Sequence, residues 1–267
     1  MRSQTLILIA ILLVAPLLIT INTCETGNTS ITFPKKWHGK TKIILHHSEK
    51  LSQILLVKYS EVVDIGDPDN DGARDGYKLL GLWWDLSKYP DGVPYMVNPF
   101  LARFLYKLKI RDIMAEVKAS FEAWDNAVSV ELYNDRPRLT FRSPNMYFPD
   151  YRNIVGWGYI QPTDIVSIAS IWYNPETGEI VDADIILNLY HNWGIDWDDE
   201  GTQYQLTDAF DIQNIVTHEA GHLSGLDDIY DSTYWAMTMY GYTYKGETKK
   251  ISLEPGDIAG IQAVYGG

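Results

Sequence analysis

Two histidines and a glutamate stand close together in the sequence, at a spacing that suits a metal-binding helix. His218 and His222 are four residues apart, and Glu219 follows the first of them. Residues four apart share one face of a helix, so both imidazoles can reach one metal ion. The glutamate can take a proton from metal-bound water, which is the chemistry of a zinc hydrolase. A bare H-E-x-x-H pattern also arises by chance, so its meaning depends on the residues that follow.

The residues after this pattern extend it toward a third ligand. Gly225 and Asp228 follow His222, and no further histidine occurs in the chain. The extended pattern resembles that of the metzincin metalloproteases, H-E-x-x-H-x-x-G-x-x-H, with Asp228 where the family usually has its third histidine. Carboxylate oxygen is an accepted zinc ligand, and the resemblance therefore implies zinc bound by His218, His222 and Asp228. Asp227 is the competing neighbour, and the family's register favours Asp228.

Two downstream segments narrow the resemblance to one branch of metzincins. Residues 238–241 read Thr-Met-Tyr-Gly, which resembles the Met-turn beneath the metal site. Met237 is an alternative, but the tyrosine that follows directly selects Met239. Residues 253–266 resemble the closing helix of matrixins, L-x-x-x-D-x-x-G-I-Q-x-x-Y-G. The chain thus resembles a secreted, prokaryotic-type matrixin.

The matrixin resemblance implies an α+β fold of the metzincin or zincin-like class. It implies a twisted mixed β-sheet, a long helix, the active-site helix, and a small C-terminal subdomain with the Met-turn and closing helix. For the active-site helix, Thr207 and Asp208 suggest the start, with Asp208 and Asp211 in the first turn. Gly225 suits a left-handed residue just past its end. A buried stripe is predicted from helical spacing at Ala209, Ile212, Val216, Ala220 and Leu223.

Upstream segments agree with this fold in order and spacing. Residues 93–98 resemble the first strand, and Asn98 and Pro99 suggest a helix cap and first helical residue. Apolar residues at threes and fours predict one long amphipathic helix from Leu101 to Trp124. Short strands are expected at 138–142 and 153–160.

Residues 182–188 resemble the matrixin edge strand, along which substrate is added as a further strand. This assigns substrate contacts to Ile185 and Leu187. Asp182 and Asp184 fit solvent-facing strand positions slightly better than a ligand role.

Composition bounds the remaining possibilities. The 267 residues, 46% of them hydrophobic and nine of them tryptophan, suffice for one substantial core. A net charge of −13 and a pI near 4.8 argue against nucleic acid and anionic membranes as partners. We expect a monomer that acts on protein or peptide substrates. The single cysteine, Cys24, excludes an internal disulfide and lacks the P-R-C-G-x-P-D setting of the usual matrixin latency device.

The N-terminus carries a targeting signal. Arg2 precedes an apolar run from Leu6 to Ile21, so residues 1–23 are expected to be a secretory signal peptide or membrane anchor. Cys24 raises the alternative of a lipid anchor, although Asn22 and Thr23 make a poor lipidation motif. We assign residues 24–76 to an N-terminal segment, either a propeptide or extra strands, and residues 77–267 to the catalytic domain. The expected location is extracellular.

A second metal is suggested just before the catalytic domain. Acidic residues at alternating positions with Gly72 at the sixth resemble a D-x-D-x-D-G calcium loop. The candidate ligands are Asp67, Asp69, Asp71 and Asp75. Lys78 stands where an EF-hand has its bidentate glutamate, so a looser calcium loop or a plain turn are the two interpretations.

These observations predict a zinc endopeptidase in which zinc lowers the pKa of bound water and Glu219 is the general base. One alternative is a gluzincin-type peptidase with Glu247 or Glu254 as third ligand. Another is a non-catalytic, calcium-dependent cell-surface module on the same fold, which the presence of Glu219 disfavours.

Overall fold

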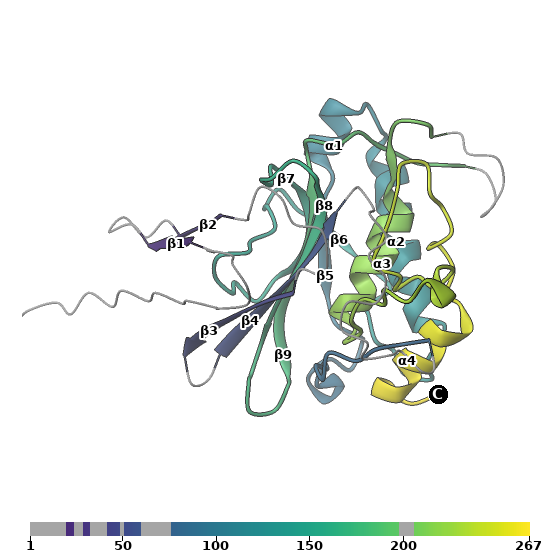
Figure 1. The fold of residues 1–267 in the computed structure, drawn as a ribbon. Coiled ribbons are helices and arrows are strands. Elements are labelled where there is room, and N and C mark those ends of the chain that lie inside the picture. The colour runs from purple at the N-terminus through teal and green to yellow at the C-terminus, as the bar shows by residue number, and fades with distance from the viewer. Residues whose placement is uncertain (1–19, 24–28, 33–41, 49–50, 60–75, 198–205) are drawn as a thin grey trace, which may run out of the picture.

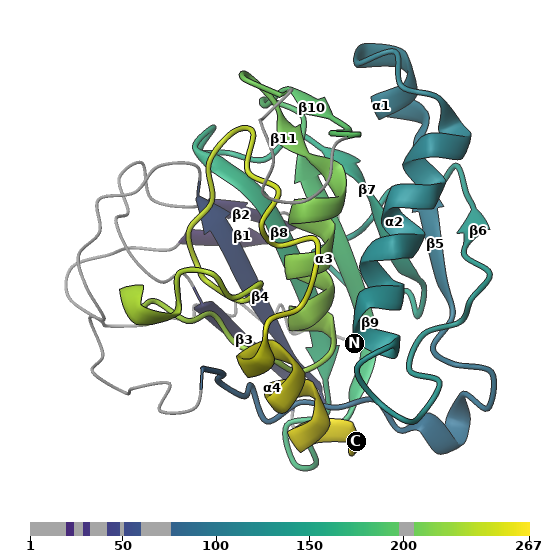
Figure 2. The same ribbon diagram turned by 90° about the vertical axis from the view of Figure 1, so that its right-hand side faces the viewer.

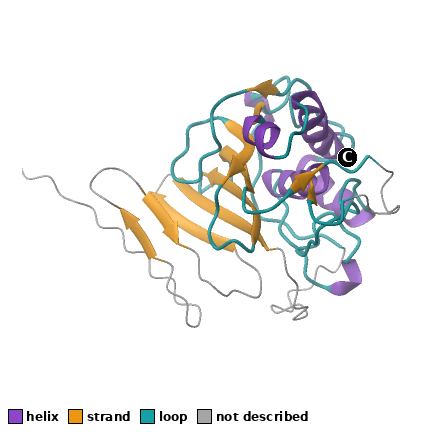
Figure 3. Cartoon of the chain, turned by 90° about the horizontal axis from the view of Figure 1, so that it is seen from above, coloured by secondary structure: helices purple, strands orange, loops and turns teal. Residues whose placement is uncertain are grey.

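The computed structural model describes residues 20–23, 29–32, 42–48, 51–59, 76–197 and 206–267. Within them, a twisted mixed sheet carries its helices on one side, as Figures 1 and 3 show. This is the α+β, metzincin-like fold expected from the sequence. No described helix is both long and apolar enough to cross a membrane. The residues of the candidate calcium loop, Cys24 and most of the apolar N-terminal run lie outside the described residues.

The main sheet has a parallel half and an antiparallel half. The order is β3-β4-β8-β9-β7-β5-β6, with β5, β6, β7 and β9 parallel and β8, β4 and β3 added antiparallel. The strands are β3 (Lys42–Ser48), β4 (Leu51–Tyr59), β5 (Tyr95–Asn98), β6 (Arg138–Leu139), β7 (Asn153–Gly158), β8 (Ile165–Tyr173) and β9 (Ile180–Asn188). Two small pairs lie apart from this sheet: β1 (Thr20–Thr23) with β2 (Thr29–Thr32), and β10 (Trp193–Gly194) with β11 (Phe210–Asp211).

The sheet order corrects the prediction that residues 182–188 form an edge strand. Ile185 and Leu187 lie on β9, which is hydrogen-bonded to β7 on one side and β8 on the other. Both side chains are buried in the main core, so neither can contact a substrate added at an edge. Asp182 and Asp184 are also buried rather than solvent-facing, and they accept backbone N–H groups of Asp150 and Ile154 respectively.

Two helices cover the same face of the sheet and pack against each other. They are α2 (Ile110–Asp125) and α3 (Ile212–Leu223), which run side by side in Figure 2. The main apolar core lies between them and the sheet, with Trp124 and Phe121 among its largest members. A smaller apolar cluster, including Leu55 and Val57, lies on the opposite face.

The predicted long helix is two helices. A short α1 (Phe100–Leu105) ends before Lys107, whose φ of 59° breaks the helix, and α2 begins at Ile110. Phe104 is 80% exposed, so the apolar spacing there does not mark a buried face. Pro99, rather than Asn98, is the N-cap of α1, while Asn98 accepts the Phe100 N–H with its side chain.

The C-terminal part after α3 is an irregular chain that closes with a helix. It contains the 3-10 turn η2 (Ser232–Tyr234) and ends in α4 (Pro255–Tyr265), which lies below α3 in Figure 2. A further 3-10 turn, η1 (Leu86–Lys88), precedes the first parallel strand. The part after α3 matches the expected C-terminal subdomain.

Candidate metal centre and active site

Helix α3 carries the two histidines and is buried on all sides. It begins at Ile212, where the Asp211 carboxylate caps it by accepting the Asn214 N–H at 2.7 Å. The predicted start at Thr207 and Asp208 is therefore wrong, because residues 210–211 form β11 instead. The predicted stripe is buried at Ile212, Val216, Ala220 and Leu223, whereas Ala209 lies before the helix. Because the opposite side is covered too, the histidines face other protein groups rather than solvent.

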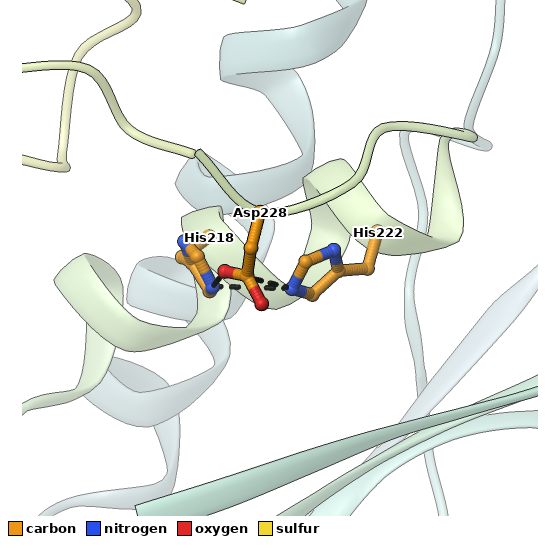
Figure 4. Close-up of side chains that lie close together, drawn as sticks. All are labelled: His218, His222 and Asp228. Atoms are coloured by element: carbon orange, nitrogen blue, oxygen red, sulfur yellow. Dashed lines mark hydrogen bonds and ion pairs between the residues drawn. The ribbon is translucent and has the colours of Figure 1, made fainter. Parts of the chain in front are cut away.

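A sharp turn after α3 brings an aspartate back to the histidines. Gly225 has a φ of +100°, and an added Cβ there would collide with the Leu82 carbonyl oxygen. Glycine is the residue that takes this left-handed conformation without strain. Three positions later, the Asp228 carboxylate points at both imidazoles (Figure 4).

The three side chains converge on one point. Nε2 of His218 lies 3.1 Å from Nε2 of His222 and 3.3 Å from Oδ1 of Asp228. Nε2 of His222 lies 3.7 Å from the same oxygen. One ligand atom from each residue falls within 4.8 Å of the others, and all three residues are buried.

The outer ring nitrogens fix which nitrogen faces the centre. Nδ1 of His218 donates to the Thr238 carbonyl at 2.7 Å, and Nδ1 of His222 donates to the Leu226 carbonyl at 2.9 Å. A carbonyl oxygen can only accept, so Nδ1 carries the proton of a neutral ring and Nε2 presents a lone pair. Burial lowers the pKa of His218 well below its ordinary value, which favours the neutral ring. This is the arrangement of metal-binding histidines oriented by outer hydrogen bonds.

The donor set fits a zinc ion. Oδ1 of Asp228 is buried and receives no hydrogen bond, while Oδ2 accepts the Tyr230 hydroxyl at 3.0 Å. Burial alone would raise the pKa of Asp228, but the His222 and His218 rings and Lys58 lower it below its usual range. Two imidazole nitrogens and a carboxylate oxygen this close together repel one another unless a cation lies among them. Such a mixed nitrogen and oxygen set is typical of catalytic zinc.

The competing carboxylates lie elsewhere. Asp227 turns away, with Oδ2 at 3.6 Å from the Lys78 ammonium and Oδ1 accepting the Asp228 N–H. Glu247 faces Asn214 and Lys250, at 3.5 and 3.9 Å. Glu254 is the N-cap of α4. None of the three belongs to the His218, His222 and Asp228 cluster.

Glu219 stands beside the cluster and is held from the sheet. Its Oε1 accepts the Ser167 hydroxyl of β8 at 2.5 Å, while Oε2 is buried without a hydrogen-bond partner. Burial raises the pKa of Glu219, opposed by the His222 ring and the Ser167 hydrogen bond. A buried carboxylate with one oxygen fixed and one free is suited to exchanging a proton with a small molecule at the centre.

Met239 packs against α3 at Gly221. An added Cβ at Gly221 would overlap the Met239 sulfur and come within 2.5 Å of the Trp124 ring. The Asp257 carboxylate of α4 accepts the N–H groups of Thr238 at 2.8 Å and Met239 at 3.0 Å. Because the Thr238 carbonyl orients His218, α4 supports the centre through this one carboxylate.

Two buried lysines near the centre were missed by the sequence patterns. The Lys250 ammonium donates to the carbonyls of Thr238 at 3.1 Å and Tyr240 at 2.5 Å. The Lys58 ammonium, from β4, donates to the Tyr240 carbonyl at 3.0 Å and lies 3.1 Å from Nε2 of His218. Burial lowers the pKa of Lys58 to about 8. The sequence offers one signal for Lys58, which is that it directly follows the apolar run 54–57. On a strand, Lys58 shares a face with Ile54 and Leu56, whose side chains are buried.

Comparison with known proteins decides the family. The Matrixin family model matches residues 100–266. The chain belongs to the matrixin family. This matrixin match includes the whole centre, Met239 and α4, but not β3 or β4.

Two curated plant proteins are also similar to this matrixin. Metalloendoproteinase 4-MMP of Arabidopsis thaliana is 29% identical over 107 residues, which is 40% of this chain and 28% of that protein. Metalloendoproteinase 1-MMP of the same plant is 27% identical over 162 residues, 60% of this chain and 39% of that protein. The chain thus spans less than half the length of either relative.

Proposed function

We propose that this matrixin is a zinc-dependent endopeptidase. The convergence of His218, His222 and Asp228 beside a buried, half-satisfied Glu219 supports this most strongly. Zinc bound there would lower the pKa of a coordinated water and polarise a peptide carbonyl. The names of the curated relatives, both metalloendoproteinases, favour peptide bonds as the target.

In the proposed hydrolysis, Glu219, Ser167 and Asp228 each have a separate role. Glu219 takes the proton of the attacking water and passes it to the departing amine, so the carboxylate ends the cycle as it began. Ser167 keeps one oxygen of Glu219 in place during both transfers. Asp228 brings negative charge where most metzincins have a neutral ring, so the pKa of the water should fall less than in a three-histidine site.

Replacement of Glu219 tests the proposal. Glu219→Gln should keep one zinc per chain and lower hydrolysis of a denatured protein by ~10²-fold or more, because only the general base is lost. Zinc content by mass spectrometry and cleavage with and without a chelator are the measurements. Wild-type turnover by Glu219→Gln would refute the mechanism. Zinc binding without any hydrolysis by the wild type would favour the non-catalytic alternative.

On sequence grounds we further propose export from the cytoplasm and calcium binding by residues 67–75. The apolar run at 6–21 and the alternating Asp residues support these proposals. Calcium bound to the folded chain should raise the melting temperature of metal-stripped protein by mass action, with zinc content unchanged. A melting temperature indifferent to calcium would make this segment an ordinary turn.

A further inference from the structure

Strand β4 lies beside β8 in the sheet, on the side of β8 away from β9, and its Lys58 reaches the metal centre. It pairs antiparallel with β8 from Ser52 opposite Tyr173 to Tyr59 opposite Ile165. The family match begins at residue 100, so it leaves out β5 as well as the neighbouring pair β3 and β4. Without β3 and β4, β8 would be the edge strand, with unpaired N–H and C=O groups open to another extended chain.

The pairing of β4 with β8 places the Lys58 ammonium at the metal centre. Lys58 lies directly opposite Ser167, the residue that holds Glu219. The Lys58 side chain is buried, and its ammonium reaches Nε2 of His218, the lone pair that a metal would use. The Lys58 ammonium and a metal ion would both lie against Nε2 of His218. Because both are positively charged, they would repel each other strongly and compete for the same ligand atoms. Seating of β4 should therefore weaken metal binding at the centre without excluding it.

The side chains of β4 indicate what kind of extended peptide could take its place beside β8. Ile54 and Leu56 face the main core, and Leu55 and Val57 face the cluster on the other side of the sheet. An extended peptide with apolar side chains at the positions of Leu56 and Ile54 would make the same contacts. Backbone hydrogen bonds supply affinity in such strand addition, and alternate side chains supply selectivity.

We propose that residues 51–58 are an internal occupant of a peptide-binding surface along β8, and that an extended substrate displaces them. This inference rests on the proposed peptidase function and names how that site is regulated. Because β4 is joined to the catalytic domain, it competes at an effective concentration on the order of millimolar, even against a substrate in solution. The intact chain should therefore be held in a low-activity state.

Hydrogen exchange of the full-length, zinc-loaded chain tests displacement directly. The probe is a hexapeptide with apolar residues in which a phosphinate replaces one peptide bond. At saturation, amides of residues 51–58 should exchange about tenfold faster or more, while those of β9 should not change. Peptide bound with β4 still protected would overturn the inference, and so would zinc-loaded protein that never binds the peptide.

A substitution tests the competing charge. Lys58→Met should tighten zinc binding about tenfold, measured by competition with a chelator, and should lower the KM for an apolar peptide. Lys58→Arg, which keeps the charge, should bind zinc like the wild type if it folds. The matched control is Lys118→Met on α2, because Lys118 forms surface ion pairs with Glu122 and Asp135. Unchanged or weaker zinc binding in Lys58→Met would count against the inference.

Different results would refute the zinc endopeptidase function and the displacement of residues 51–58. Wild type and Lys58→Met that both bind no zinc and cleave nothing would refute the proposed function itself. Equal zinc affinity and equal KM in the two, with normal hydrolysis, would refute only the internal occupant and leave β4 as a permanent strand. The melting temperature of each variant without metal shows whether a loss reflects unfolding, and the exchange experiment on the wild type needs no substitution.

Discussion

The helix side and the sheet side of the metal centre are built differently. On the helix side, the backbone carbonyls of Thr238 and Leu226 orient the imidazoles, while the Tyr230 hydroxyl and the Asp257 carboxylate hold Asp228 and the Met-turn. On the sheet side, single side chains make the contacts, with Ser167 on Glu219 and Lys58 on His218.

This difference means that one side fixes the positions of the ligand atoms and the other affects what can approach them. Backbone carbonyls are fixed by the fold, so the positions of the ligand atoms are held to the precision that metal binding needs. The sheet-side contacts come from side chains, and one of them, Lys58, belongs to a strand that precedes the matched family region. The helix side therefore positions the ligand atoms, and the sheet side tunes the charge around them and what reaches them.

Removal of the third ligand should have the largest effect on the helix side. Asp228→Ala should weaken zinc binding by about 100-fold or more, because it removes a direct ligand rather than an outer partner. Asp227→Ala and Glu247→Ala should retain zinc, since their carboxylates point to lysines. Asp228→His should restore binding, because imidazole serves equally well there. Zinc titration decides, and loss of zinc in Asp227→Ala with retention in Asp228→Ala would reverse the assignment.

Crowding the underside of the helix should have the next largest effect. Gly221→Ala places a methyl group against Met239 and Trp124, and should lower the free energy of unfolding by about 2–3 kcal/mol. At Gly81 an added Cβ meets nothing within 4 Å. Gly81→Ala should thus cost only its left-handed strain, about 1 kcal/mol. Urea unfolding compares the two, and equal losses would mean that the Met-turn yields easily.

Removing the Ser167 hydroxyl should alter turnover but not metal binding. Ser167→Ala removes the hydrogen bond that favours charged Glu219, so kcat should fall roughly tenfold, the value of one bond to a charged group. Since that bond lowers the pKa of Glu219, its loss should move the acidic limb of the rate profile to higher pH. Ser167→Thr, which keeps a hydroxyl, should retain both properties. An unshifted acidic limb in Ser167→Ala would show that Ser167 does not position the base.

The smallest effect is expected from the buried carboxylate of β9. Burial raises the pKa of Asp182 to about 6, so the folded chain binds its proton more tightly than the unfolded chain does. Its contribution to stability is full below pH 4 and is lost as pH rises through about 6. Relative to Asp182→Asn, the wild-type melting temperature should therefore fall by about 4 °C between pH 4 and 7. Asp85, whose pKa is lowered by the Ser87 hydroxyl, is the control, because Asp85→Asn should show the opposite, smaller trend.

The residues of the centre could be predicted because they depend on local spacing. Helical periodicity places His218 and His222 together, and the turn at Gly225 brings the following acidic pair close by. Sheet order has no such signal. Residues 182–188 could be predicted as a strand, but whether that strand lies at an edge of the sheet depends on pairing with distant residues. The burial of Lys58 depends on partners such as Tyr240 that lie far away in sequence.

The helix break at Lys107 has the same origin. Apolar spacing continues through residues 101–108, yet Phe104 faces solvent and the chain turns at a left-handed residue. Local propensity is a weak guide where tertiary packing decides the path.

The link between Asp257 and the Met-turn also sets an order of events during synthesis. His218, His222 and Asp228 leave the ribosome before Asp257 does, and for several seconds, at about 5–20 residues per second, the Thr238 carbonyl has no anchor. A nascent chain thus displays the ligands before it can hold them rigidly. Rigid metal coordination is therefore expected only once α4 has been synthesised and Asp257 has bound the Met-turn.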